Sequence, residues 1–69
     1  MNDKNRRQSI IELIADLRYL AKKTKGLTQK ETDGYFISFL NRMTEMNERY
    51  ANDLERMLQT IKAGKDFAD

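Results

Sequence analysis

The sequence contains no cysteine, no histidine and no proline, and only three of its 69 residues are glycine. The absence of cysteine excludes disulfides and thiolate metal sites. The absence of histidine removes the commonest metal ligand and the usual general base near neutral pH. A chain this short forms a core that supplies only a few kcal/mol, so small folds usually need disulfides, metals or oligomerisation. Association with another chain is therefore the expected source of additional stability.

The remaining composition is typical of long helices. Charged residues make up 35% of the sequence, and the lack of proline removes the residue that most strongly interrupts a helix. We therefore predict an all-α fold. No apolar run is long enough for a membrane span or a secretion signal, so we expect a cytoplasmic protein with no membrane association.

The first helix is predicted over about residues 8–25, with an earlier start near Asn2 or Asp3 as the alternative. Ser9-Ile-Ile-Glu12 has capping-box spacing, in which the serine and glutamate side chains satisfy free backbone N–H groups. Gly26 follows three lysines, a pattern typical of a helix end, so the helix is expected to stop just before it. Apolar residues recur at three- and four-residue steps, which places them on one face: Ile10, Leu13, Ile14, Leu17, Leu20 and Ala21.

A second capping-box pattern, Thr28-Gln-Lys-Glu31, predicts where the next helix begins. The turn is then residues 26–28, the second helix spans about residues 29–63, and residues 64–69 form a tail. So short a connection makes consecutive helices antiparallel neighbours. The sequence therefore predicts a single domain over residues 1–69, an antiparallel two-helix hairpin with a short first helix and a long second helix.

The second helix carries a long apolar stripe. Gly34 would cost about 1 kcal/mol inside a helix, so the alternative is that the long helix starts near Tyr35. The stripe continues for three to four heptads, which is the minimum for a coiled coil. Position a would be taken by Leu40, Asn47, Leu54 and Ile61, and position d by Phe36, Met43, Tyr50 and Met57.

The predicted helices differ in length, roughly 28 Å against 50 Å at 1.5 Å per residue. The first helix would then leave Tyr50 to Ile61 bare, and a soluble monomer rarely exposes such a patch. Residues 1–8 could lengthen the first helix over this patch, but residues 2–8 are all polar and could bury little of it. We therefore predict that a second chain, most simply a second copy, covers it to form a small helical bundle or coiled coil. Asn47 would pair with its symmetry mate and fix the register, or else be solvated at the edge of the stripe. The candidate interface is Phe36, Phe39, Leu40, Met43, Asn47, Tyr50, Leu54, Met57, Leu58 and Ile61.

Charge is distributed unevenly along the chain. Residues 1–30 hold eight basic and three acidic residues, a net of +5, and residues 31–69 hold five basic and eight acidic residues, a net of −3. This difference fits attraction between the two helices, or an anionic partner for the first helix. The candidate nucleic-acid contacts are Arg6, Arg7, Arg18, Lys22, Lys23 and Lys25. In outline, the predicted dimer resembles the small dimeric hairpins that plasmids and phages use as RNA-binding regulators, without sharing a motif with them.

Three arginines, Arg42, Arg49 and Arg56, recur at seven-residue spacing and therefore lie along one edge of the second helix. Such a row can bind phosphates or acidic side chains. Glu45 and Asp53 stand four and three residues before two of these arginines, which are favourable spacings for ion pairs within a helix. We expect a solvated, salt-bridged edge.

No catalytic pattern is present. Ser9 and Ser38 do not lie in a nucleophile elbow or an S-x-x-K pattern, and two helices offer no deep pocket. We therefore expect no enzyme activity, cofactor, metal or small-molecule substrate. The leading hypothesis is a phage or bacterial small protein, a dimeric helical regulator or inhibitor that binds another protein through its helical surfaces. The alternatives are a regulator that binds RNA or DNA through the basic face of the first helix, and a structural assembly subunit.

Overall fold

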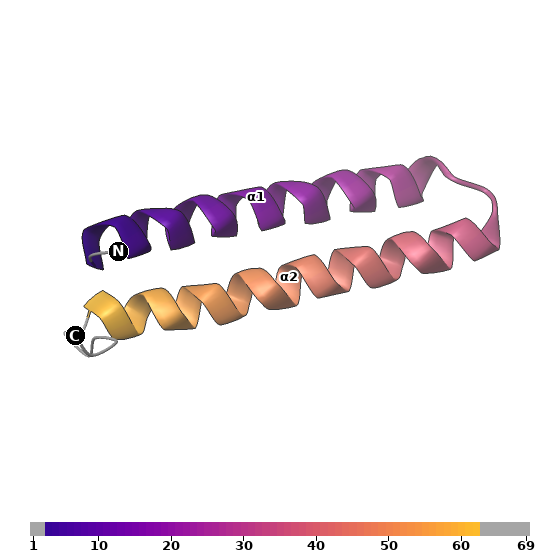
Figure 1. Cartoon of the computed structure of the whole chain (residues 1–69). Coiled ribbons are helices and arrows are strands. Elements are labelled where there is room, and N and C mark those ends of the chain that lie inside the picture. Colours follow the sequence, from indigo (N-terminus) through magenta and orange to yellow (C-terminus); the bar gives the residue numbers. More distant parts are fainter. Residues whose placement is uncertain (1–2, 63–69) are drawn as a thin grey trace.

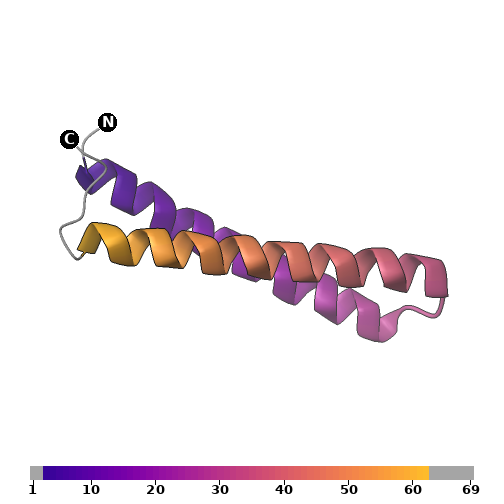
Figure 2. The same cartoon turned by 90° about the horizontal axis from the view of Figure 1, so that it is seen from below.

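The computed structural model describes the backbone of residues 3–62 and the side-chain surroundings of residues 5–61. It contains two helices, α1 (Asp3–Lys30) and α2 (Gly34–Lys62). They lie side by side and run in opposite directions (Figure 1). Seen from below, they cross at a small angle (Figure 2), as helices do when their side chains interlock. The all-α prediction is confirmed for the described residues, and the predicted tail lies outside them.

The two helices are nearly equal in length, 28 and 29 residues, so the prediction of a short first and a long second helix is wrong. Gly26 lies inside α1, which continues to Lys30. Thr28 also belongs to α1 and does not cap α2, because its hydroxyl donates to the carbonyl oxygen of Thr24 at 3.0 Å. An internal glycine costs about 1 kcal/mol relative to alanine, and packing of the last turn against α2 offsets this cost.

The turn consists of residues 31–33, and Asp33 caps α2. The backbone N–H of Tyr35 donates to Oδ1 of Asp33 at 3.0 Å, and the N–H of Ile37 donates to its carbonyl oxygen at 2.9 Å. Aspartate is among the preferred residues at this position because its side chain accepts from a free N–H of the first turn. Gly34 is consequently the first residue of α2 and does not interrupt it.

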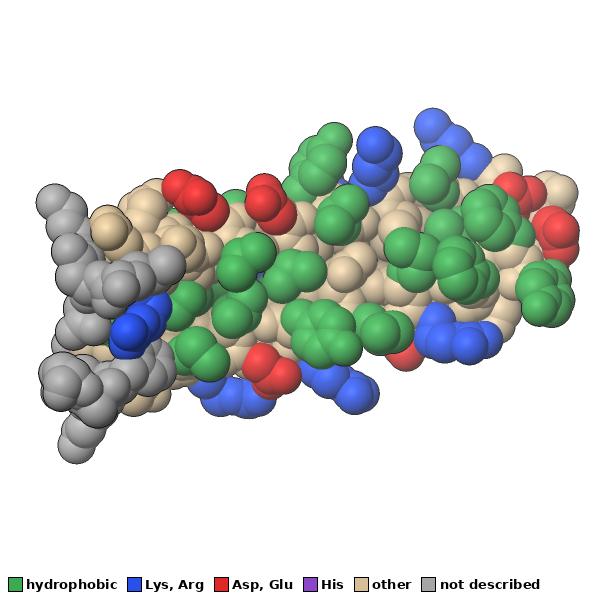
Figure 3. All heavy atoms as spheres, viewed as in Figure 1, with side chains coloured by type: hydrophobic (Ala, Val, Ile, Leu, Met, Phe, Trp, Pro, Cys, Tyr) green, Lys and Arg blue, Asp and Glu red, His purple; other side chains and the backbone are tan. Residues whose placement is uncertain are grey.

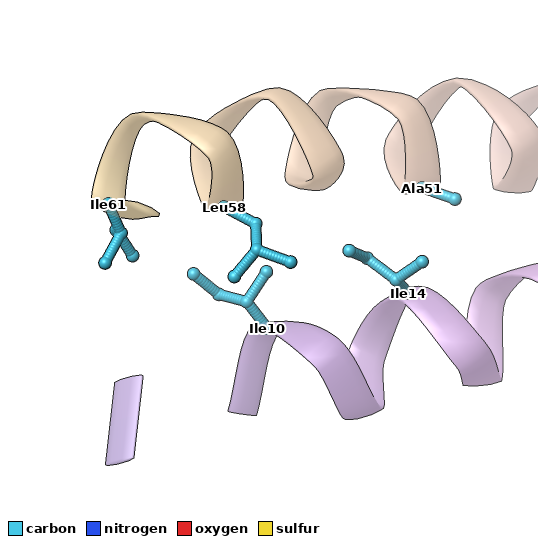
Figure 4. Packing of buried hydrophobic residues seen from close by; sticks show 5 residues of the cluster. All are labelled: Ile10, Ile14, Ala51, Leu58 and Ile61. Atoms are coloured by element: carbon cyan, nitrogen blue, oxygen red, sulfur yellow. The ribbon is translucent and has the colours of Figure 1, made fainter. Parts of the chain in front are cut away.

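The helices meet along a seam whose positions recur at alternating three- and four-residue steps. This spacing keeps every seam position on the side of its helix that faces the other helix. The strongest apolar cluster lies near the chain termini, where Ile10 and Ile14 of α1 face three residues of α2 (Figure 4): Ala51, Leu58 and Ile61. The buried or half-buried seam positions are Ile10, Ile14, Leu17, Ala21, Thr24 and Thr28 on α1, and Ile37, Leu40, Thr44, Asn47, Ala51, Leu54, Leu58 and Ile61 on α2.

α1 covers the C-terminal half of α2, so the prediction that residues 50–61 lie bare is wrong for the seam side. Leu58 and Ile61 are each only 9% exposed, and Ala51 is completely buried. The covering side chains are Ile10 and Ile14. They face this part of α2 because α1 continues to Lys30, which moves the turn to residues 31–33 and brings the start of α1 beside the end of α2. A longer first helix therefore replaces the second chain that the sequence predicted for this surface.

The predicted heptad positions of α2 are half right. The predicted a positions lie in the seam, but the predicted d positions are exposed, and the residue after each one faces α1 instead. Two of these seam residues are Thr44 and Ala51, which are small or polar. Small side chains allow two helices to approach closely, whereas a hydrophobicity pattern ranks them below neighbouring phenylalanine and methionine. The residues displaced outward are Phe36, Met43, Tyr50 and Met57.

A hydrogen-bonded pair of threonines interrupts the apolar seam. Thr24 and Thr44 are 7% and 8% exposed, and their Oγ1 atoms lie 2.5 Å apart. Thr24 Oγ1 is also 3.0 Å from the carbonyl of Ala21, and Thr44 Oγ1 is 3.0 Å from that of Leu40. Because two hydroxyls hold two protons, one threonine donates to the other, and the second donates to its own helix. A buried polar pair favours the register that brings its members together, which is the role that the sequence predicted for Asn47.

Candidate functional site

One side of the hairpin carries nine of the twelve large apolar side chains that are exposed among the described residues. Each of the nine immediately precedes a seam position. Because the helices are antiparallel and face one another, these positions fall on the same side of both helices. Figure 3 shows that side, with hydrophobic side chains gathered over α1 and α2. We call it the apolar face: Leu13, Leu20 and Leu27 of α1, and Phe36, Phe39, Met43, Met46, Tyr50 and Met57 of α2.

The apolar face is as large as a protein interface. Its members are between 37% exposed, at Met43, and 51% exposed, at Tyr50. Taking about 200 Å² for each large apolar side chain, they present roughly 800 Å² of surface. The largest apolar patch on a typical monomer is about 300–600 Å², and each partner in a standard protein complex buries about 800 Å². The face therefore matches the contribution of one partner to a stable complex.

The chemistry of the face changes along its length. Near the turn, the rings of Phe36 and Phe39 stack with centroids 6.5 Å apart and planes inclined by 14°. Farther along α2, the face is formed by Met43, Met46 and Tyr50. Aromatic side chains and methionine are enriched in interface cores, and the flexible thioether adapts to surfaces of different shape. One end of the face is thus stiff and the middle is deformable.

Charged residues border the apolar face. On α2, each of Arg42, Arg49 and Arg56 stands immediately before a member of the face, so this row of arginines forms its outer edge. Arg56 pairs with Asp53 through a hydrogen-bonded salt bridge, which confirms one of the predicted ion pairs. The corresponding edge of α1 includes Glu12, which accepts a hydrogen bond from the side chain of Gln8. The two edges therefore differ in charge.

The opposite side of the hairpin is polar and carries a salt bridge between the two helices. Arg18 of α1 donates to Glu55 of α2 at 2.6 Å, with both side chains about half-exposed. A solvated pair of this kind contributes at most about 1 kcal/mol. Next to it, an open hollow of about 400 Å³ is lined by residues of both signs: Arg18, Ala21, Lys22, Lys25, Glu48 and Asn52. We call this side the charged side.

The six basic residues predicted to contact nucleic acid do not form one surface. Arg18, Lys22 and Lys25 surround the hollow on the charged side, where acidic residues of α2 accompany them. Lys23 lies toward the apolar face, with its ammonium 6.0 Å from the centre of a neighbouring tyrosine ring. The Arg6–Arg7 pair is more than ten residues away along α1, or about 16 Å. The predicted contact is thereby divided among three regions.

The ten residues predicted for an interface also divide. Leu40, Leu58 and Ile61 are buried against α1, and Leu54 and Asn47 are half-buried in the same seam. These five belong to the contact between the two helices and offer little surface to another chain. The remaining five lie on the apolar face: Phe36, Phe39, Met43, Tyr50 and Met57.

Sequence reasoning missed the contribution of α1 to the apolar face. Leu13, Leu20 and Leu27 recur at seven-residue spacing, which signals a continuous line along one helix. The prediction assigned the first two to the side facing the second helix and placed Leu27 in the turn. It also left Met46 out of the interface. With α1 continued to Lys30, the seven-residue spacing would have identified the line.

Metal-binding clusters and membrane-spanning helices are absent from the described residues. Among the residues searched, no group of acidic side chains is arranged to hold a metal ion. Neither α1 nor α2 is long and apolar enough to cross a membrane. Comparisons with protein-family models, with curated proteins and with solved structures found no match to this chain.

Proposed function

We propose that this chain is a non-enzymatic protein-interaction module that acts as a small helical regulator or inhibitor. It binds another polypeptide through the apolar face, and the observation that supports this proposal is the size and continuity of that face. Exposure of roughly 800 Å² of apolar surface in one patch is unfavourable in water and is relieved when a partner covers it.

The partner is a helix or a pair of helices. The described chain has no strand edge to which an extended peptide can add, because its backbone groups are paired within two helices. The members of the face from residue 36 to residue 57 extend over about 32 Å of α2. A straight surface of this kind accepts a helix whose apolar residues recur at three- and four-residue steps.

Nucleic-acid binding by the basic face of α1 is the alternative, and it has less support. Phosphate binding requires basic residues that follow one path along the backbone. Here the candidate residues lie in three regions, and Arg18 is paired with Glu55. A structural assembly subunit remains a second alternative, which uses the same apolar face.

The proposal is tested by affinity capture from the native host, with proteins and nucleic acids scored separately. The chain carrying both Met46→Lys and Tyr50→Lys adds two charges to the centre of the apolar face. The matched control is Gln59→Lys with Ser38→Lys, which adds the same charges at exposed positions outside both the apolar face and the hollow. We expect the wild type and the control to retain the same proteins and the face variant to lose them. Retention of nucleic acid that falls steeply with salt and is indifferent to the face variant would refute the proposal.

A further inference from the structure

We infer that the occupant of the apolar face is a second copy of this chain. The two hairpins form a four-helix bundle in which α1 of each copy packs against α2 of the other. This inference rests on the proposed function, because it identifies a partner for the same face. It also specifies an arrangement that the proposed function leaves open.

The core of the single hairpin is small, as expected for one half of a four-helix bundle. Seven apolar residues are buried among the described residues, two of them are alanines, and no large side chain is fully buried. The apolar face holds nine large side chains that are 37–51% exposed, so a single hairpin leaves a large part of its apolar surface uncovered. Two copies joined through this face would bury about 1,600 Å² in total, which is the standard size of a specific interface. Each copy then supplies the core that the other lacks.

Two symmetric arrangements bring the faces together. When the two-fold axis is parallel to the helices, α1 lies next to the partner's α2, and both turns are at the same end. When the axis is perpendicular to them, like helices are neighbours, and the turns are at opposite ends. Both arrangements bury the same side chains, so the charges along the borders distinguish them.

The perpendicular axis brings like charges together. It places the border of α2 beside the same border of the partner, which runs in the opposite direction. The row of arginines at positions 42, 49 and 56 then faces an identical row, with Arg49 near the partner's Arg49. Like charges placed side by side repel each other, and this repulsion disfavours the perpendicular axis.

The parallel axis brings opposite charges together at Glu12 and Asp16, whereas Lys23, which is level with residue 45, comes between the partner's Arg42 and Arg49. Thr24 is level with Thr44 in the hairpin, so Asp16, eight residues before Thr24, is level with residue 52. Glu12 is level with residue 56. A two-fold axis parallel to the helices leaves each residue at the same height along the bundle in both copies. Glu12 therefore lies beside the partner's Arg56, and Asp16 lies between the partner's Arg49 and Arg56.

The arrangement is tested by measuring the distance between the two turns. The chain has no cysteine, so Thr32→Cys carries one nitroxide label per copy in the exposed turn. Pulsed electron paramagnetic resonance should give a separation of about 10–25 Å, because bundle helices pack 8–10 Å apart. A separation of about 40 Å, the length of a helix, would establish the perpendicular axis and overturn the arrangement.

Charge exchange tests the border contacts. Glu12→Arg should weaken self-association about tenfold in sedimentation equilibrium, and so should Arg56→Glu. The double variant should recover most of the loss, because it restores opposite charges across the interface. Equal weakening in the double and single variants would refute the contact. Circular dichroism confirms that each variant keeps its helical content, which separates lost association from unfolding.

The same measurements separate this inference from the proposed function. Tyr50→Lys should produce a monomer, whereas the control Gln59→Lys should remain a dimer. A wild type that is monomeric over a wide concentration range would overturn the inference. In that case, loss of captured protein on Tyr50→Lys would still support the proposed function. A Tyr50→Lys variant that changes neither self-association nor capture would overturn both.

Discussion

Replacement of Gly26 by alanine is expected to stabilise the protein. Gly26 lies within α1, four residues before its end. A methyl group built at this position meets nothing within 4 Å, so alanine adds no steric clash. Alanine restricts the unfolded chain and favours helix over glycine by about 0.8–1 kcal/mol. For a domain of this size, 1 kcal/mol corresponds to a rise of about 4–8 °C in Tm.

Whether Tm rises or falls in Gly26→Ala distinguishes two possible local structures at this residue. If Gly26 ended the first helix, as the sequence pattern suggests, it would adopt a left-handed conformation that alanine disfavours, and Tm would fall. The assay is thermal unfolding followed by circular dichroism, with all variants at the same protein concentration so that association does not contribute. Gly34→Ala serves as the control: Gly34 also has open space around it but stands at the first position of α2, so its effect should be smaller. A fall in Tm for Gly26→Ala would refute the continuous helix.

Three further substitutions test the seam and the turn. Thr24→Val and Thr44→Val should each change the free energy of unfolding, and a double-mutant cycle in urea should give a coupling of about 1 kcal/mol; a coupling near zero would contradict the hydrogen bond. Leu58→Ala should destabilise the hairpin by about 2–4 kcal/mol in the same assay, because this nearly buried side chain packs against Ile10; a loss below about 1 kcal/mol would place Leu58 outside the core. Asp33→Ala should cost about 1 kcal/mol in thermal unfolding, and an unchanged Tm would show that Asp33 does not cap α2.

The sequence was sufficient to predict two packed helices. The apolar spacing along each helix, the absence of proline and the capping-box pattern after Gly26 all indicate two helices joined by a tight connection. The attraction expected between a basic and an acidic helix also has a counterpart in the pair formed by Arg18 and Glu55. These features depend on local spacing and charge, which can be read without knowledge of the partner helix.

The exact ends of the helices depend on contacts that local patterns do not contain. Thr28 and Asp33 are both acceptable caps, and they stand only five residues apart. Gly26 fits a helix end as well as a helix interior. The choice is made by packing, because continuing α1 to Lys30 lengthens its contact with α2 and leaves Asp33 to cap the next helix.

The interface was only partly predictable for a related reason. Apolar side chains occupy both the seam of α2 and the positions that immediately precede it. Hydrophobicity favours residues such as Met43 and Tyr50 over their neighbours Thr44 and Ala51. Close packing of two helices reverses this order, because small side chains fit where backbones approach. A single sequence shows that α2 has excess apolar surface, but only the paired helices show which side is left free.

Contacts at the two ends of the seam are expected to affect different rates, those near the turn the folding rate and those near the open end the unfolding rate. Thr24 and Thr44 are 20 residues apart in the sequence, whereas Ile10 and Leu58, in the strongest cluster, are 48 apart. Closing the longer loop costs about 0.8 kcal/mol more in chain entropy, so contacts near the turn are expected to form first. The apolar cluster then forms late and acts mainly on the unfolding rate. The capped turn and the pair of threonines form first during folding, and the isoleucines and leucine at the open end of the hairpin determine how slowly it unfolds.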